Sequence, residues 1–184
     1  MPVDHESRKL LTIGRNDLLR DGGDDQFRNM VHNLLALSAR LEQIRNRFGS
    51  FIGLSGPQYT MLVTVRQVEG EKGIGIRGLS NYLSLSPPFV TVETTKLVQA
   101  GILEKRSDPD DLRRIRLTVS PSGIALLERL APMQRDINNL LFSPVTAADF
   151  DQICELTEDL GQSADQALRL SDQLLTTDRS ARKA

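Results

Sequence analysis

Apolar residues recur at three- and four-residue steps along most of this 184-residue chain, which is the spacing of amphipathic helices. The first long stretch of this kind covers residues 27–48 and is followed by Gly49, a residue type that commonly ends helices. A second helix is predicted to begin at Ser55-Gly56-Pro57, since proline at the first helical position loses no hydrogen bond. The pattern therefore predicts a chain built mainly from α-helices.

Two more long helices are predicted in the C-terminal third of the chain. Ser120-Pro121 begins one of them, and Pro132 should kink it. Thr146 and Asp149 have the spacing of a capping box, with aspartate in place of the usual glutamate, and begin the other. Both predicted helices carry an apolar stripe along one side.

The middle of the chain has shorter elements. Residues 77–83 form a predicted short helix. The turn 84–88 is rich in serine and proline and leads into another helix, Pro88 to Ala100, with Ser86 as its predicted N-cap. Two helices joined by so short a turn are typical of a helix-turn-helix.

A predicted β-hairpin follows directly. Residues 102–106 and 115–119 are strand candidates, and the loop 107–114 between them is rich in turn-forming residues. A hairpin placed immediately after a helix-turn-helix is a wing.

Three motifs surround this predicted wing: LVQAGILEK at 97–105, DPDDLR at 108–113 and VSPSG at 119–123. They closely resemble the MarR family of transcriptional regulators, whose pattern is a leucine before a glycine-terminated helix, a short strand, a D-P-x-D-x-R wing and an L-T-x-x-G restart. Lys105 stands where arginine is common and Ser120 where threonine is usual, and both changes keep the chemistry. The resemblance covers roughly residues 27–170.

The resemblance implies a mainly α fold with a small β-wing, made of a winged helix-turn-helix DNA-binding lobe and a helical dimerisation lobe. The expected parts are a polar extension at 1–25, a single domain at 26–175 and a flexible tail at 176–184. Within that domain, the winged helix-turn-helix is expected at about 55–120 and the dimerisation helices at about 26–48 and 121–175. These helices have more apolar surface than one small domain can cover, which also indicates a homodimer; a helix bundle closed within one chain is the alternative.

The predicted helix from Pro88 to Ala100 is the expected recognition helix, because a major groove about 12 Å wide admits one helix. Its polar side chains are candidates for contacts with phosphates or base edges, with exposure to solvent alone as the alternative for each: Ser86, Thr91, Thr94, Thr95 and Lys96. Phe89 and Val92 would either touch thymine methyl groups or pack inward. Glu93 would repel phosphates, so we expect it to lie sideways.

The predicted wing adds cations that suit a narrow minor groove, where the potential of DNA is most negative. The candidates are Lys105, Arg113, Arg114 and Arg116. The family resemblance implies that Arg113 enters the groove and that Asp111 orients it. An exposed ion pair without function is the alternative.

In the MarR family, small aromatic acids and other effectors often bind between the dimer helices and the DNA-binding lobe. The resemblance therefore implies a pocket for a small aromatic or carboxylate effector near His32, Arg40, Tyr59 and Met61, although their spacing shows nothing by itself. For His32, an ordinary surface or core position is the alternative. Cys154 is interpreted as a buried, inert thiol, and no cofactor or metal is expected, because the few histidines and the single cysteine lack ligand spacing.

The net charge and the missing motifs exclude several classes of function. The net charge of −1 argues against a general polyanion binder but leaves a sequence-specific one open, because only the contacting face matters. The chain lacks an apolar signal core, a membrane-spanning stretch and the common motifs of hydrolases, nucleotide-binding enzymes and metalloproteases. The sequence thus predicts a cytoplasmic transcriptional regulator, not an enzyme, that binds a pseudo-palindromic operator as a repressor released by an effector. The alternative is a winged-helix protein-interaction module without DNA binding.

Overall fold

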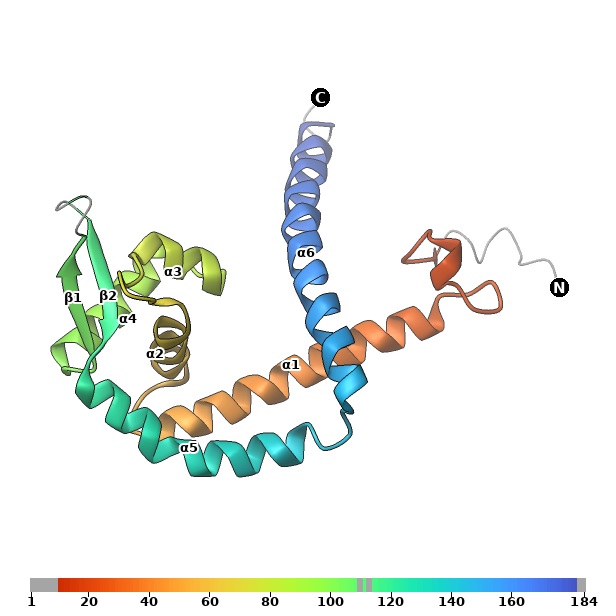
Figure 1. Cartoon of the computed structure of the whole chain (residues 1–184). Coiled ribbons are helices and arrows are strands. Elements are labelled where there is room, and N and C mark those ends of the chain that lie inside the picture. Colours follow the sequence, from red (N-terminus) through yellow and green to blue (C-terminus); the bar gives the residue numbers. More distant parts are fainter. Residues whose placement is uncertain (1–9, 109–110, 112–113, 182–184) are drawn as a thin grey trace. The chain divides into compact units, whose positions relative to one another are not determined.

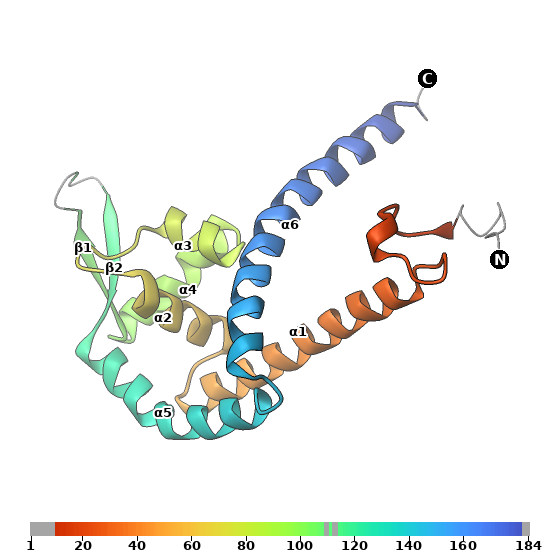
Figure 2. The same ribbon diagram turned by 45° about the vertical axis from the view of Figure 1, so that its right-hand side comes forward.

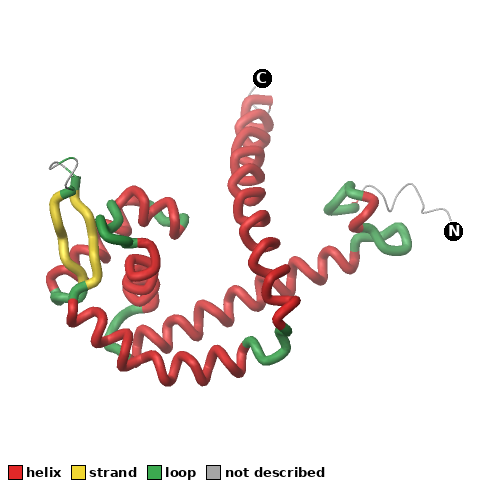
Figure 3. Tube along the Cα trace, in the orientation of Figure 1, coloured by secondary structure: helices red, strands yellow, loops and turns green. Residues whose placement is uncertain are grey.

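The computed structural model describes residues 10–108, 111 and 114–181 of the chain. Helices account for most of these residues, and one short antiparallel hairpin accounts for the sheet (Figures 1 and 3). The predicted fold class, mainly α with a small β-wing, is therefore confirmed.

The elements follow one another in the predicted order. Their bounds are α1 Asp25–Phe51, α2 Gly56–Val68, α3 Ile76–Leu83, α4 Pro87–Gln99, β1 Leu103–Ser107, β2 Ile115–Val119, α5 Pro121–Leu141 and α6 Ala147–Ala181, and a 3-10 turn, η2, lies at Asn16–Leu18. The chain divides into two compact units, residues 1–134 and 135–184, and the division falls inside α5.

The core of the first unit lies where α2, α3, α4 and the hairpin meet. Its most deeply buried apolar side chains come from all of these elements: Tyr59, Met61, Leu62, Val65, Leu79, Val90, Leu97, Leu103 and Leu117. Burying a side chain of this kind stabilises a fold by about 1.5–3 kcal/mol relative to leaving it exposed. Because α4 contributes to this core, its position relative to α2 and α3 is set by packing.

The hairpin lies at the edge of this unit, beside α3 and α4 (Figures 1 and 2). Its register pairs Leu103 with Val119 and Ser107 with Ile115. Ile74, just before α3, exchanges two backbone hydrogen bonds with Leu117, at N–O distances of 3.0 and 2.8 Å. The hairpin is thereby attached to the helix-turn-helix through backbone as well as side chains.

The VSPSG motif has a structural role at the start of α5. The Ser120 hydroxyl accepts from the Gly123 N–H at 3.0 Å and donates to the Gly101 carbonyl at 2.6 Å, so it caps the helix and connects it to the end of α4. A Cβ on Gly123 would lie 2.8 Å from Val119 Cγ1 and still closer to the Ile102 carbonyl oxygen. Glycine is therefore needed here for the close approach of two backbone segments.

The ends of two helices differ from their predictions. Helix α1 continues past Gly49 to Phe51, so the prediction that Gly49 ends it is wrong. A Cβ on Gly49 would lie 2.9 Å from the carbonyl oxygens of Leu54 and Ser55, which explains the glycine by close packing instead. Helix α6 extends to Ala181, well into the segment 176–184 that was expected to be a flexible tail.

The second unit consists of the end of α5 and of α6. The predicted capping box at the start of α6 is confirmed, with Thr146 Oγ1 accepting from the Asp149 N–H at 3.2 Å and the Asp149 carboxylate accepting from the Thr146 N–H at 3.0 Å. The side chains of residues 147–179 are all exposed on the single chain. Cys154 is among them, so the prediction of a buried thiol is wrong.

Candidate nucleic-acid interface

Helix α4 is held by one face and leaves the opposite face open. Val90, Thr94 and Leu97 are buried completely or almost completely, as expected for residues spaced three and four apart. With 3.6 residues per turn, Val92, Thr95 and Gln99 lie on the other side, and Val92 keeps 53% of its surface exposed. An exposed helix face of this kind is what a major groove can accept.

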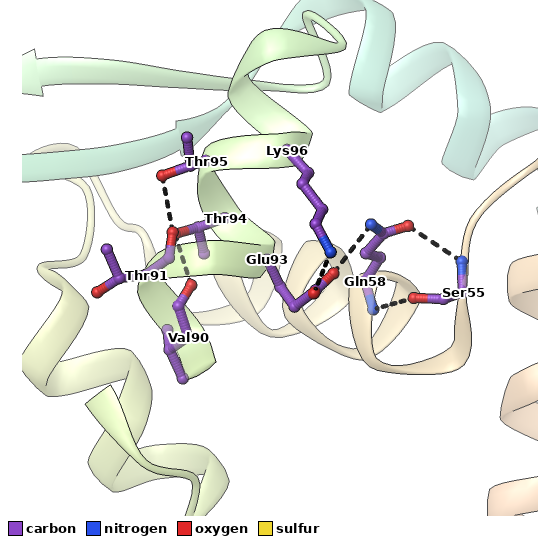
Figure 4. Close-up of polar contacts among 8 residues, drawn as sticks. All are labelled: Ser55, Gln58, Val90, Thr91, Glu93, Thr94, Thr95 and Lys96. Atoms are coloured by element: carbon purple, nitrogen blue, oxygen red, sulfur yellow. Dashed lines mark hydrogen bonds and ion pairs between the residues drawn. The ribbon is translucent and has the colours of Figure 1, made fainter. Parts of the chain in front are cut away.

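The predicted contact residues differ in how their hydroxyl groups are used. Thr91 donates to the Pro87 carbonyl at 2.8 Å and Thr95 donates to the Thr91 carbonyl at 2.7 Å. Thr94 is fully buried, and its hydroxyl donates to the Val90 carbonyl at 2.7 Å (Figure 4). Direct contact between Thr94 and DNA is therefore ruled out by burial, and that part of the prediction is wrong.

A carboxylate links α4 to α2. Glu93 is 8% exposed, and its two carboxylate oxygens accept from the Gln58 side-chain amide at 3.0 Å and from the Lys96 ammonium at 2.6 Å (Figure 4). Gln58 itself completes the capping box of α2 with Ser55. As expected, Glu93 lies sideways, but it also binds Lys96, the only cation of α4.

Ser86 is the N-cap residue of α4, as predicted, but its hydroxyl makes no capping hydrogen bond. Its side chain is exposed at the open end of the helix. Pro87 and Pro88, the first two residues of α4, have no N–H group, so a contact with a phosphate here would come from the Ser86 hydroxyl. Ser86 thus stays a candidate for a backbone contact with DNA.

The wing is organised by a buried aspartate. Asp108 is 1% exposed and accepts from Arg116 Nε at 2.7 Å, and the Asp108 N–H donates to the Arg114 carbonyl at 2.9 Å. Arg114 pairs with Asp111 at 3.1 Å, while Lys105 is exposed on β1. The predicted groove residue Arg113 lies outside the described residues, so its pairing with Asp111 stays a prediction.

Sequence reasoning overlooked two groups that position these contacts. The Gln58–Glu93 hydrogen bond joins residues 35 positions apart, and no periodicity predicts it. Asp108 was read only as part of the wing motif, whereas the structure buries it beneath Arg116. An aspartate followed by proline at a strand end, with an arginine on the returning strand, is the signal that could have indicated it.

The four predicted effector residues are not brought together. Tyr59 and Met61 lie in the core, at 2% and 0% exposure, whereas His32 and Arg40 are exposed on α1. Tyr59 and Met61 lie on different sides of α2, and both sides are covered by packing, which corrects the predicted pocket. Burial raises the pKa of Tyr59, and the nearby Arg45 guanidinium and the hydrogen bond from Gln134 partly oppose this.

A groove of about 570 Å³ does lie close by, between α1, the start of α2 and the turn into α4. Its lining combines apolar and polar side chains: Ser38, Leu41, Glu42, Arg45, Asn46, Gly56, Pro57, Thr60, Leu83, Leu85 and Phe89. Arg45 donates to Thr60 Oγ1 at 3.1 Å and its guanidinium lies 5.4 Å from the centre of the Tyr59 ring. The groove thus offers one oriented cation beside an apolar wall.

In the part of the chain that the structure describes, no three histidine, cysteine, aspartate or glutamate side chains gather as a metal site would require. Within the same residues, none of the helices has the length and apolar character needed to cross a bilayer.

Comparisons with known proteins agree with this architecture. Residues 54–115 match the model of the MarR family. Among curated proteins, no sequence matches this chain significantly. Solved structures with the same fold include a MarR protein from Peptoclostridium difficile, at 21% identity and a TM-score of 0.62 over 84% of this chain and 96% of that one.

Two further structures were solved with bound molecules. The MepR–DNA complex from S. aureus shows 18% identity and a TM-score of 0.59, covering 72% of this chain and 96% of MepR. The PcaV transcriptional regulator from Streptomyces coelicolor, in complex with its natural ligand, shows 23% identity and a TM-score of 0.53, covering 70% of this chain and 91% of PcaV. The match to the MarR family model thus covers the helix-turn-helix and the first strand of the hairpin, and the solved structures share the winged helix-turn-helix fold of this chain.

Proposed function

We propose that this chain is a cytoplasmic, homodimeric repressor that binds a pseudo-palindromic operator and is released by a small effector. The observation that carries the DNA-binding part is the open face of α4, held in place by its buried face beside a hairpin with basic side chains. In this proposal α4 enters the major groove and the hairpin reaches the neighbouring minor groove. The structure of MepR with DNA, which has the same fold, supports this use of the fold.

The wing is proposed to contribute Lys105, Arg113 and Arg114. Lys105 is exposed on β1, and Arg114 is exposed beside the hairpin tip. For Arg113 the support is the sequence motif alone. Replacing Arg113 by alanine should weaken operator binding by about tenfold, the loss of one good contact, without changing the melting temperature. Unchanged affinity would remove the wing from the mechanism.

The test of DNA binding is fluorescence anisotropy with duplexes from the gene's own upstream region and with a scrambled duplex of equal length. Specific binding should exceed binding to the scrambled duplex by about 10³-fold or more. The affinity should fall steeply with salt, because each neutralised phosphate releases counterions. Equal, weak affinity for both duplexes would instead support the alternative, a winged-helix module that binds proteins.

Dimerisation is supported by apolar side chains that nothing covers in the single chain. On α1 they are Met30, Val31, Leu34, Leu35 and Leu37, and on α6 they include Phe150, Ile153, Leu156 and Leu160. Contiguous apolar surface of this kind commonly marks a protein–protein interface. Light scattering at micromolar concentration should give the mass of a dimer, and the mass of a monomer would contradict the proposal.

The effector is proposed to be a small carboxylate with an apolar body. The groove beside Arg45 supports this, since a guanidinium binds a carboxylate well and Leu41, Leu85 and Phe89 supply apolar contacts. Because the groove is lined by α1 and by the start of α4, a ligand there would favour one arrangement of the two. Screening aromatic and acyl carboxylates by thermal shift, and then by release of DNA, tests this; Arg45→Leu should abolish both responses.

A further inference from the structure

The outward face of α4 presents almost no hydrogen-bond donors in its first three turns. Thr91 and Thr95 each commit their hydroxyl proton to a carbonyl of the same helix, at 2.8 and 2.7 Å. The ammonium of Lys96 is bound by Glu93 at 2.6 Å. Val92, between the two threonines, has no polar atom on its side chain and is 53% exposed.

What this face does present is methyl groups and hydroxyl oxygens. Once Oγ1 of a threonine lies against the backbone, the γ-methyl is the other group that its Cβ can offer to a partner. Thr91 Oγ1 and Thr95 Oγ1 retain lone pairs but have no proton to donate. The face therefore combines the methyl groups of Val92 with threonine methyl groups and hydrogen-bond acceptors.

Base edges in the major groove differ in whether they suit such a face. Guanine shows only the acceptors N7 and O6, which require donors from the protein. Thymine carries the one methyl group in the groove, and its partner adenine carries an N6 amine that donates. An A·T pair thus matches both properties of the face, and a G·C pair matches only through the cytosine amine.

We infer that α4 reads A·T pairs through thymine methyl groups, with Val92 as the specificity-determining residue. This inference rests on the proposed DNA-binding function and names the bases that this function reads. Glu93 contributes indirectly, because it withdraws the helix's only cation from the face. Gln99 is the exposed amide on the same side, but it lies at the far end of the helix from the N-terminal turns that usually enter the groove.

The experiment uses the full chain in two steps. Binding sites are first selected from a library of randomised duplexes, and affinities are then measured with each thymine of the selected half-site replaced singly by deoxyuridine. This replacement removes only the 5-methyl group and leaves base pairing intact. The same series is repeated with Val92→Ala and with Gln99→Ala, two exposed changes on the same helix.

We expect the selected half-site to contain A·T pairs at its centre, and at least one deoxyuridine to weaken binding about fourfold, the contribution of one buried methyl group. Val92→Ala should lose the sensitivity to that replacement, whereas Gln99→Ala should keep it. Selection of a site whose affinity changes less than 1.5-fold at every thymine (about 0.2 kcal/mol) would overturn this inference and leave DNA binding intact. Failure to enrich any sequence would overturn the proposed DNA-binding function, and this inference with it.

Discussion

Glu93 is the only acidic residue on α4, and its contacts predict an unusual effect on DNA binding. Glu93→Gln keeps an acceptor for Gln58 but removes the charge that holds Lys96. The released ammonium can then contact a phosphate, so binding to non-specific duplex should tighten. The salt dependence should steepen by about 0.9 per added contact.

The matched control is the double variant Glu93→Gln/Lys96→Ala, which should return the salt dependence to that of the original chain. Lys96→Ala alone should change it little, because Lys96 is already paired. Anisotropy titrations between low and moderate salt measure all four proteins. A loss of salt dependence in Lys96→Ala would show that Lys96 contacts DNA despite Glu93.

Asp24, at the N-terminal end of α1, gives the N-terminal segment a pH dependence. Its carboxylate accepts from the hydroxyl and the N–H of Thr12, both at 2.6 Å, and these hydrogen bonds lower the pKa of Asp24. A lowered folded-state pKa means that the stabilisation is present above the ordinary carboxyl range and is lost as the pH falls through the folded value.

The amide resonance of Thr12 should therefore be constant near neutral pH and shift in acid, below about pH 4. Two-dimensional NMR across this range measures it. In Asp24→Asn the same resonance should not titrate. A Thr12 resonance that titrates equally in both proteins would assign the change to another group.

At the scale of single elements, Asp108 anchors the wing. Asp108→Asn removes the charge that accepts from Arg116 beneath the hairpin, where the aspartate side chain is 2% and the arginine 30% exposed. Because one partner is buried, we expect a loss of about 1–3 kcal/mol in the free energy of unfolding. The control is Glu104→Gln, which breaks the exposed pair with Arg106 and should cost at most about 0.5 kcal/mol. Urea unfolding compares them, and equal losses would contradict the anchor role.

Replacing a glycine by alanine should have opposite effects on stability at two positions, Gly123 in α5 and Gly161 in α6. Gly123→Ala should destabilise the first unit by about 1–3 kcal/mol, because its Cβ would clash with Val119 and the Ile102 carbonyl. Gly161→Ala in α6 meets nothing within 4 Å and should stabilise the helix by about 0.5–1 kcal/mol. Urea unfolding for the first and helical circular dichroism for the second test this. Stabilisation by Gly123→Ala would mean that the two backbones can separate.

The order and type of elements could be read from the sequence because each helix has one apolar face and its own start signal. Helix ends were less predictable: Gly49 does not stop α1, since its role depends on the backbone of residues 54–55, which only the folded chain brings near. The contacts of the candidate interface were hard to predict for the same reason, because some of them join residues that only folding brings together. The apolar spacing of α4 does indicate that Thr94 faces inward. The hydrogen bond between Glu93 and Gln58, in contrast, spans 35 positions, and no spacing predicts it.

Across the whole molecule, the exposed apolar face of α1 predicts that stability depends on concentration. If a second copy covers this face, unfolding also separates the two chains, so a tenfold dilution should lower the free energy of unfolding by about 1.4 kcal/mol per dimer. Leu34 is 50% exposed in the single chain, and Leu34→Asp would place a charge in that interface. This variant should sediment as a monomer, with a melting temperature that no longer depends on concentration.

Tyr82→Asp is the matched control, because Tyr82 is 55% exposed on α3, in the helix-turn-helix, and should leave the dimer intact. Measurements of DNA binding also test whether the α1 face is the dimer interface. A pseudo-palindromic operator needs two recognition helices, so Leu34→Asp should lose most of its operator affinity while still binding one half-site weakly. If Leu34→Asp instead stays dimeric and binds normally, the α1 face is not the interface, and the apolar residues of α6 become the surface to test.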